Sequence, residues 1–202
     1  ITSALPSTSS NQKPKSIALV VNQNEIFYRL RMPWVRLLRE NGYKVYAVVA
    51  SGAWNERIEA GGAEFVEWKL SRSGRNPLSE FGSLIGLTRI LRRIKPDIVQ
   101  NFHTKPNIYA PIAAKLAGVP VTVSTVTGLG YTFVERAGLG SKVGKRMNIG
   151  MYSFANRLAD QVAFQNPDDM DLLRNRGGLS NSKGLFITGG SGVDVTEYCP
   201  RT

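Results

Sequence analysis

The 202-residue sequence contains very little cysteine and histidine. Cys199 is its one cysteine and His103 its one histidine. A single cysteine excludes a disulfide framework within the chain and a cysteine-rich zinc site. A single histidine excludes every site that needs two.

Long apolar runs are also missing, because none reaches the roughly 18–20 residues that a membrane-spanning helix needs. Hydrophobic residues nevertheless make up 42% of the chain and charged residues 20%, with 8 Phe, 7 Tyr and 3 Trp. This composition excludes a wholly disordered chain. A chain of this length forms one large domain or two small ones and buries roughly 70% of its unfolded surface.

Acidic residues are scarce relative to basic ones. Lys and Arg number 26 against 15 Asp and Glu, which gives a formal net charge of +11 at pH 7. Such a surplus favours anionic partners: nucleic acid, acidic lipid headgroups or phosphorylated ligands. The surplus of basic residues is most concentrated over residues 69–95, where Glu80 is the one acidic residue. The basic residues there are Lys69, Arg72, Arg75, Arg89, Arg92, Arg93 and Lys95. A solvated helix face beside a loop would show the same charge pattern.

Strand and helix patterns alternate along the sequence. Short apolar or β-branched runs predict strands at 16–21, 44–50, 64–70, 97–102, 119–126, 161–165 and 184–188. Periodic apolar positions predict helices from after residue 24 to about 41, and at 53–60, 76–94, 105–117, 143–160 and 168–174. We expect Pro33 in the first turn of its helix or at a kink, and a mobile loop at 138–145. The alternation predicts an α/β fold: a Rossmann-like parallel sheet of about seven strands with helices on both faces.

Ligands of parallel sheets bind where the carboxyl ends of the strands meet, near the point at which strand order reverses. The segments 22–24, 103–107 and 127–131 follow predicted strands and reach this edge. Gly128 and Gly130 would let backbone N–H groups approach a ligand, although an ordinary tight turn also uses glycine. A histidine directly after a strand is a candidate site residue, or a packed or capping side chain.

Two nucleotide-binding motifs are missing. The loop after the first strand, residues 22–24, has no glycine, which argues against the Gly-x-Gly-x-x-Gly turn that binds NAD or FAD. Gly140 and Gly144-Lys145 are spaced wrongly for a P-loop, and Arg146 follows where Ser or Thr is needed. We therefore exclude a P-loop ATPase.

A set of short segments, in register with the predicted elements, resembles the amino-terminal half of bacterial family-4 glycosyltransferases, which have the two-Rossmann GT-B fold. The segments are Leu30-Arg31-Met32-Pro33, Arg75-Asn76-Pro77-Leu78, the run 102–109 (FHTKPNIY), the run 126–133 (VTGLGYTF), the run 165–169 (QNPDD) and the run 190–194 (GSGVD). The resemblance covers about residues 16–200. It is strongest to the subgroup that builds exopolysaccharides and other glycans on undecaprenyl diphosphate. The chain departs from many members in lacking a glycine pair after the first strand and in having Thr127 where they have histidine.

The resemblance implies one half of a GT-B enzyme. It assigns a disordered arm to residues 1–15, an acceptor-binding domain to 16–188, and the start of a hinge to a carboxyl-terminal donor domain to 189–202. The implied activity is retaining transfer of a hexose from a nucleotide-sugar to a polyprenyl-diphosphate-linked or other glycan acceptor in cell-surface polysaccharide synthesis. No metal or other cofactor is implied. The chain by itself is expected to fold but to be inactive.

The resemblance also implies roles for particular residues. His103 is the expected catalytic residue, as a hydrogen-bonding partner of the transferred sugar or the acceptor. Arg31 is expected to reach a phosphate or else to be a surface residue of its helix. The expected substrate-binding residues are Arg31, Lys105, Asn107, Thr127, Gly128 and Gly130.

A lipid-linked acceptor implies a cytoplasmic enzyme held peripherally at the inner face of the plasma membrane. Basic residues between 72 and 95 would meet anionic lipid, with Val134 and Leu139 as shallow apolar anchors. The alternative is a basic α/β module that binds nucleic acid. Only the net charge supports it, because Trp68 and Phe81 fall at predicted core positions. We therefore expect no nucleic-acid partner.

Overall fold

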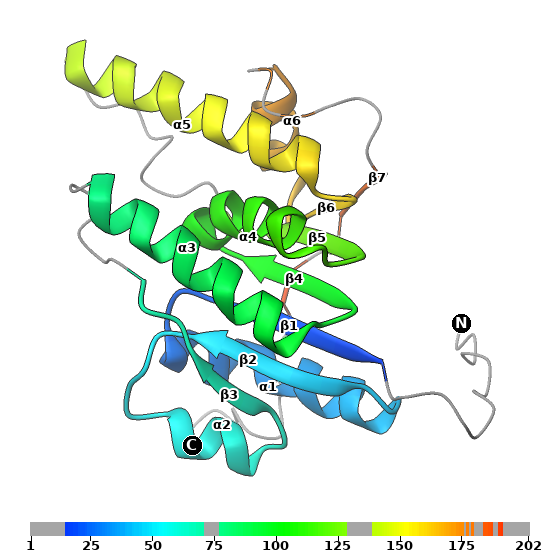
Figure 1. Ribbon diagram of the computed structural model, residues 1–202. Coiled ribbons are helices and arrows are strands. Elements are labelled where there is room, and N and C mark those ends of the chain that lie inside the picture. The colour runs from blue at the N-terminus through cyan, green and yellow to red at the C-terminus, as the bar shows by residue number, and fades with distance from the viewer. Residues whose placement is uncertain are drawn as a thin grey trace, which may run out of the picture.

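The computed structural model describes residues 15–70, 77–128, 139–175, 177, 179, 184–187 and 190–191, with residues 77, 139–148 and 184–187 described by their backbone. Within this part of the chain, seven strands form one parallel sheet in the order β3-β2-β1-β4-β5-β6-β7 (Figure 1). The strands are β1 (Ser16–Val20), β2 (Lys44–Val49), β3 (Glu64–Glu67), β4 (Ile98–Phe102), β5 (Val121–Val126), β6 (Gln161–Phe164) and β7 (Gly184–Ile187). The predicted fold class is confirmed.

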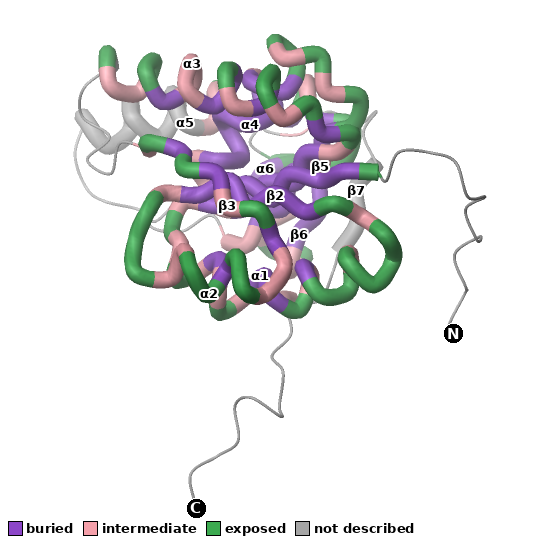
Figure 2. Tube along the Cα trace, turned by 60° about the horizontal axis from the view of Figure 1, so that its bottom comes forward, coloured by how far each residue is buried: buried purple, intermediate pink, exposed green. Residues whose placement is uncertain are grey.

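Helices cover both faces of this sheet (Figure 2). One face carries α1 (Asn24–Glu40) and α2 (Asn55–Ala60), and the other carries α3 (Pro77–Ile94) and α4 (Thr104–Ala117). Next to α4 lies α5 (Leu139–Leu158), and α6 (Pro167–Asn175) contacts β6. The predicted stops at Gly42 and Gly118 are confirmed, since both glycines have positive φ after their helices.

The central strands are apolar because both of their faces are covered. Every residue of β1 is buried, and successive side chains point to opposite faces. Leu19 packs into the cluster under α1 and α2, whereas Val20 packs into the cluster under α3 and α4. On that second side Trp68 is fully buried and donates its indole N–H to the carbonyl oxygen of Ser83 at 2.9 Å, which ties α3 to the end of β3.

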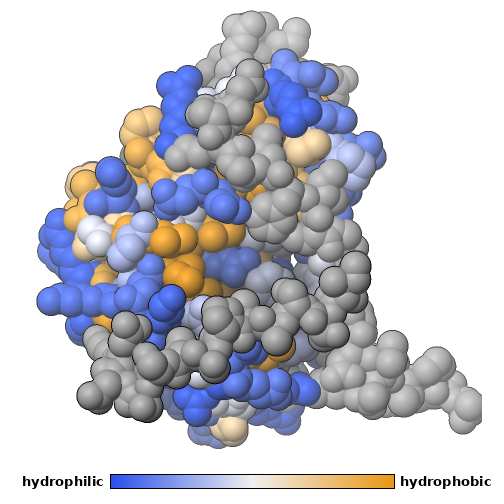
Figure 3. All heavy atoms as spheres, turned by 90° about the vertical axis from the view of Figure 1, so that its right-hand side faces the viewer, coloured by the Kyte–Doolittle hydropathy of each residue, from blue (hydrophilic) through white to orange (hydrophobic). Residues whose placement is uncertain are grey.

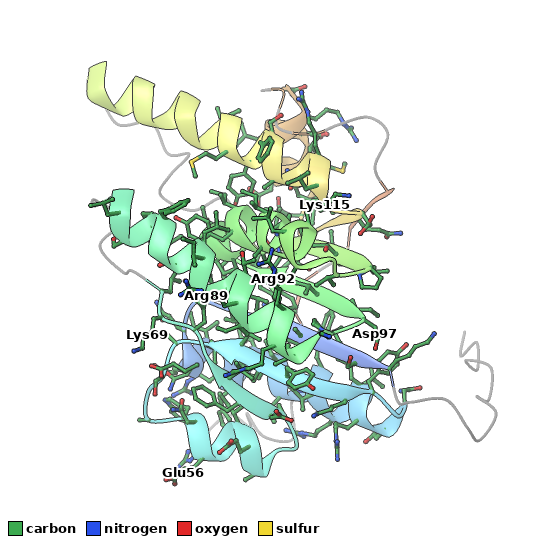
Figure 4. All side chains as sticks on the ribbon, in the orientation of Figure 1. Glu56, Lys69, Arg89, Arg92, Asp97 and Lys115 are labelled. Carbon is green, nitrogen blue, oxygen red and sulfur yellow. The ribbon has the colours of Figure 1, made fainter. Side chains whose placement is uncertain are left out.

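The carboxyl ends of the strands lie together at one edge. Figure 4 shows Lys69, which follows β3, on the left and Asp97, which precedes β4, on the right. From β1 the chain proceeds to β2 and β3 on one side, and from β4 to β7 on the other. The reversal of strand order therefore falls between β1 and β4, at the edge that the sequence nominated.

The opposite edge, at the amino ends of the strands, mixes hydrophilic and apolar side chains on its surface (Figure 3). Leu116 near the end of α4 and Val121 at the start of β5 belong to this edge and are 55% and 38% exposed. Exposed apolar side chains therefore occur at more than one place on the molecule.

Two local predictions are wrong, and one of two alternatives is excluded for a third. The helix α5 begins at Leu139, inside the loop expected at 138–145, because glycine lowers helix propensity without forbidding helical dihedral angles. Of the two positions expected for Pro33, the first turn is excluded because Pro33 lies in the interior of α1, where it removes one helical hydrogen bond; the kink stays a prediction. Phe81, expected in the core, is 62% exposed on α3, whereas Trp68 is buried as expected.

Some expectations fall outside the described residues. They are the arm over residues 1–14, the basic residues Arg72 and Arg75, the cap Asn76, and most of the expected hinge, of which only Gly190 and Ser191 are described.

Candidate functional site

A pocket of about 630 Å³ lies at the carboxyl edge of the sheet. Its lining comes from segments that follow five of the strands, together with α1 and the chain near residue 191. The residues are Asn22, Gln23, Leu30, Arg31, Leu70, His103, Thr104, Lys105, Thr127, Gly128, Gln165 and Ser191. The described lining thus contains two basic side chains and no acidic one.

His103 sits between β4 and α4 in an unusual backbone conformation, with φ of 71°. A positive φ is uncommon for residues other than glycine and is often found at functional sites. The ring Nδ1 lies 2.9 Å from the Thr127 hydroxyl, while the buried Nε2 has no hydrogen-bond partner. Burial, and secondarily the nearby Arg31 charge, lower the pKa of His103 to about 4. The imidazole is therefore neutral at pH 7 and presents one unused nitrogen.

Arg31 of α1 is the most unusual charged residue of the pocket, because only 1% of it is exposed. Its guanidinium carbon stacks 3.9 Å from the centre of the Phe102 ring. One terminal nitrogen donates to Ser191 Oγ at 3.1 Å and to the Leu30 carbonyl oxygen at 3.4 Å. The Nε and Nη2 atoms have no hydrogen-bond partner. Burial lowers the pKa of Arg31 to about 10, so the side chain remains charged at pH 7.

The positive charge of Lys105, in the first turn of α4, is compensated by the carboxylate of Glu80. Its ammonium nitrogen lies 2.9 Å from Glu80 Oε1, and the Tyr109 hydroxyl donates to the other oxygen of the same carboxylate. Burial, followed by the hydrogen bond to Glu80, raises the pKa of Tyr109. Glu80 therefore connects α3 to α4 and neutralises one of the two cations at the pocket.

Asn107 does not line the pocket, although the sequence placed it among the substrate-binding residues. It is fully buried one turn into α4. Its side-chain oxygen accepts from Asn101 Nδ2 at 2.6 Å, and its amide donates to the Thr125 carbonyl oxygen at 2.9 Å. These bonds join α4 to β4 and β5, so Asn107 holds the segment that carries His103 and Lys105.

The other predicted site residues fall into two groups. His103, Arg31, Lys105, Thr127 and Gly128 all line the one pocket. Gly130 lies outside the described residues.

The sequence reasoning missed Gln165 and Ser191 as site residues. In the amide orientation that satisfies its neighbours, Gln165 accepts from the Ser191 hydroxyl at 2.5 Å and donates to the Thr127 carbonyl oxygen at 3.2 Å. Both residues belong to segments that carried the family resemblance, which was the available signal. Glu80 was visible only as the lone acid in a basic segment.

No three His, Cys, Asp or Glu side chains converge in a metal-binding group within the described ranges. The chemistry available at the pocket is hydrogen bonding from a neutral imidazole, an arginine, hydroxyl groups and the amino-terminal turn of α4.

The fold is shared with about half of several larger chains. MurG of Acinetobacter baumannii superposes with a TM-score of 0.57 at 15% identity, covering 88% of this chain and 46% of that chain. A glycosyltransferase of Rickettsia africae superposes with a TM-score of 0.61 at 14% identity, covering 87% of this chain and 43% of that chain. The UDP-GlcNAc 2-epimerase of Neisseria meningitidis superposes with a TM-score of 0.59 at 14% identity, covering 87% of this chain and 47% of that chain. The chain thus has the architecture of one half of a GT-B fold.

A family model described as glycosyl transferase 4-like matches residues 16–166, so the chain belongs to this family. One similar protein is the N,N'-diacetylbacillosaminyl-diphospho-undecaprenol alpha-1,3-N-acetylgalactosaminyltransferase of Campylobacter jejuni, at 24% identity over 86% of this chain and 45% of that protein. Another is the UDP-Gal:alpha-D-GlcNAc-diphosphoundecaprenol alpha-1,3-galactosyltransferase of Escherichia coli, at 41% identity over 61% of this chain and 30% of that protein. The chain spans less than half the length of these curated relatives.

Proposed function

We propose that this chain is the acceptor-binding half of a glycosyltransferase that moves a hexose from a nucleotide-sugar to a polyprenyl-diphosphate-linked glycan. The observation that carries the proposal is the family membership over residues 16–166, because both relatives named above act on undecaprenyl-diphosphate-linked saccharides. The position of the pocket at the carboxyl edge of the sheet supports the same proposal.

In the proposed reaction, the bond between the anomeric carbon and the diphosphate oxygen breaks, and a bond to an acceptor hydroxyl oxygen forms. The acceptor hydroxyl gives its proton to an oxygen of the departing nucleoside diphosphate, which leaves. The family resemblance implies retention at the anomeric carbon without a metal. The donor domain follows the hinge at 189–202 in this proposal, which agrees with the relatives being more than twice as long as the matched region.

His103 is the proposed catalytic residue, since its Nε2 is buried at the pocket and has no protein partner. A neutral ring held at Nδ1 by Thr127 is positioned to hydrogen bond to a sugar hydroxyl near the transferring centre. Arg31, Lys105, Thr127 and the backbone at Gly128 line the same pocket and are the proposed substrate contacts. Asn107 is a positioning residue for them.

The lipid-linked acceptor places the proposed enzyme at the cytoplasmic face of the plasma membrane. The part of the chain that the structure describes has no helix of the length and apolarity needed to cross a bilayer. Leu78 and Phe81, at the start of α3, are 80% and 62% exposed. The same helix exposes basic side chains further along, namely Arg89, Arg92, Arg93 and, just after it, Lys95. We propose that α3 contributes to peripheral attachment to anionic lipid.

Vesicle co-sedimentation tests this attachment. Binding to phosphatidylglycerol vesicles should exceed binding to phosphatidylcholine vesicles and should weaken strongly with salt. Arg93→Gln on α3 should weaken binding about fivefold, the effect of roughly 1 kcal/mol per basic residue, whereas Arg39→Gln on the opposite face of the sheet should not. Equal binding to neutral and anionic vesicles would refute the attachment.

The function itself is tested by sugar transfer. The full-length gene product should move labelled hexose from a UDP-sugar to a synthetic polyprenyl-diphosphate-linked saccharide, and the product should be extractable into butanol. The 202-residue chain alone should show no turnover in the same assay. Transfer by the isolated chain would contradict the proposed division into two halves. Failure of the full-length protein with UDP-hexoses and UDP-N-acetylhexosamines would contradict the proposed activity.

A further inference from the structure

We propose that the pocket contains a diphosphate-binding site, formed by the Arg31 guanidinium and the amino-terminal turn of α4. The inference rests on the proposed function, because both the nucleotide-sugar and the lipid-linked acceptor carry a diphosphate group. It assigns to this half of the enzyme the recognition of that group.

The first argument is the unpaired charge of Arg31. A buried charge is costly unless a counter-charge and hydrogen bonds compensate it. Arg31 is 1% exposed, no described carboxylate pairs with it, and its Nε and Nη2 atoms lack partners. Two donors on one edge of a planar guanidinium match two oxygens of a phosphate. The geometry leaves this edge unused in the unliganded protein.

The second argument is the amino terminus of α4. This 14-residue helix has no acidic residue in its first turn and no side-chain cap at its N-terminal end. Its first residues, Thr104 and Lys105, line the same pocket as Arg31. A helix amino terminus carries partial positive charge and backbone N–H groups without intrahelical acceptors, which together favour phosphate.

The third argument is the balance of charge at the pocket. Lys105 is already paired with Glu80, and His103 is neutral at pH 7. The described lining therefore contains one uncompensated positive charge, on Arg31. An anion that bridges α4 and Arg31 supplies the missing counter-charge, and a diphosphate has oxygens enough for both groups.

Isothermal titration of the 202-residue chain tests the site with three probes: inorganic pyrophosphate, UDP and farnesyl diphosphate. Arg31→Met should weaken pyrophosphate binding about tenfold or more, as expected for lost hydrogen bonds between charged groups. Arg39→Met removes one charge from an exposed position of the same helix and should change binding less than about twofold. UDP and farnesyl diphosphate then distinguish the source, since the probe whose binding depends more on Arg31 identifies the donor or the acceptor diphosphate.

Equal losses in the two variants would reduce the effect to general electrostatic attraction and overturn the site. Absence of binding of all three probes to the wild-type chain at millimolar concentration would overturn it as well. If Arg31→Met does not fold, Arg31→Lys carries the test, because it keeps the charge and loses the forked donors; unchanged pyrophosphate affinity in that variant overturns the proposal.

Failure of this site is distinguishable from failure of the proposed function. Undiminished glycosyl transfer by full-length Arg31→Met would overturn the site and leave the function standing. Arg31-dependent binding of pyrophosphate by a protein that transfers no sugar would support the site and contradict the function.

Discussion

Two neighbouring regions at the carboxyl edge of the sheet contain buried polar side chains, and they differ in how these are satisfied. Beneath the start of α4, Asn101 donates to both Asn107 and Ser124, and Asn107 also donates to a strand carbonyl oxygen. In the adjoining pocket, Arg31 and His103 retain buried nitrogens without partners.

This difference in hydrogen bonding distinguishes polar groups that stabilise the fold from polar groups that are candidates for binding a substrate. Hydrogen bonds between buried polar groups stabilise a fold because they replace the water lost on burial. A buried group left without a partner is costly, and one that lines a pocket is a candidate for a contact to a ligand. Asn101 Oδ1 also lacks a partner, but Asn101 and Asn107 do not line the pocket, whereas Arg31 and His103 do. We therefore infer that the Asn107 network supports the architecture and that the unpartnered nitrogens of Arg31 and His103 are candidates for contacts to a substrate. Four predictions test this contrast, from the largest expected effect to the smallest.

The largest effect concerns the stability cost of the partly buried histidine, His103, at low pH. Between pH 6.5 and pH 4 the unfolded chain binds a proton at His103 that the native chain does not, so stability should fall as the pH falls through this window. The full loss amounts to at most about 3 kcal/mol. Urea unfolding of the wild type and His103→Asn at pH 7 and pH 4.5 measures it. The asparagine variant tolerates a positive φ and should lose less stability, because it has no group titrating there; parallel losses in the two proteins would show that carboxylates are responsible.

His103→Ala in the full-length enzyme should lower turnover about 10²-fold, the usual effect of removing one preorganised hydrogen-bonding group at a reacting centre. The melting temperature should fall, because the variant loses the Nδ1 bond to Thr127 and places alanine at a positive φ, so rates are compared well below the melting temperature of the variant. Initial rates of sugar transfer provide the measurement, with thermal unfolding as the control. A decrease of less than about threefold would return His103 to a structural role.

Asn107→Ala should lower the free energy of unfolding by about 2 kcal/mol, because it leaves the Thr125 carbonyl oxygen without its amide donor and removes one acceptor from Asn101. Asn41→Ala removes a bond to Leu37 at an exposed helix end and should cost less than about 1 kcal/mol. Chemical denaturation compares the two. Equal costs would mean that the buried network contributes no more than an exposed hydrogen bond.

Arg31→Met should raise the free energy of unfolding by about 1 kcal/mol, in the opposite direction to Asn107→Ala. The variant replaces an unpaired buried charge with an apolar side chain of similar length. Denaturation of the unliganded chain at pH 7 measures the change. A clear destabilisation would show that the Ser191 bond and the Phe102 contact outweigh the cost of burying the charge, and would move Arg31 to the structural side of the contrast.

Much of the architecture was predictable from local patterns. The alternation of β-branched runs with periodic apolar segments located all seven strands to within a few residues. Glycine at helix ends marked the stops at Gly42 and Gly118 because the left-handed conformation disfavours other residues. The start of α5 was less predictable, since its glycines lower helix propensity by only about 1 kcal/mol each, which packing elsewhere in the helix overcomes.

The membership of the pocket was predictable in part. Ligands of parallel sheets bind at the carboxyl ends of the strands, and this rule predicted that His103, Lys105, Thr127 and Gly128 lie together. All four line the pocket. Ser191 was not predictable as a contact of Arg31, because 160 residues separate the two along the chain and no local pattern records the encounter.

By itself, the sequence determined the fold class, the edge of the sheet at which the pocket lies and the resemblance to the glycosyltransferase family, because these follow from periodicity and short motifs. Only the tertiary structure decided which polar groups are satisfied. Asn107 and His103 lie on the same short segment, yet one is bonded on both sides and the other presents an unused nitrogen. The sequence left two alternatives for Arg31, a surface position on its helix or a place in the site. The structure shows Arg31 buried in contact with Phe102. Hydrogen-bond satisfaction and burial depend on neighbours distant in the chain, so no local pattern determines them.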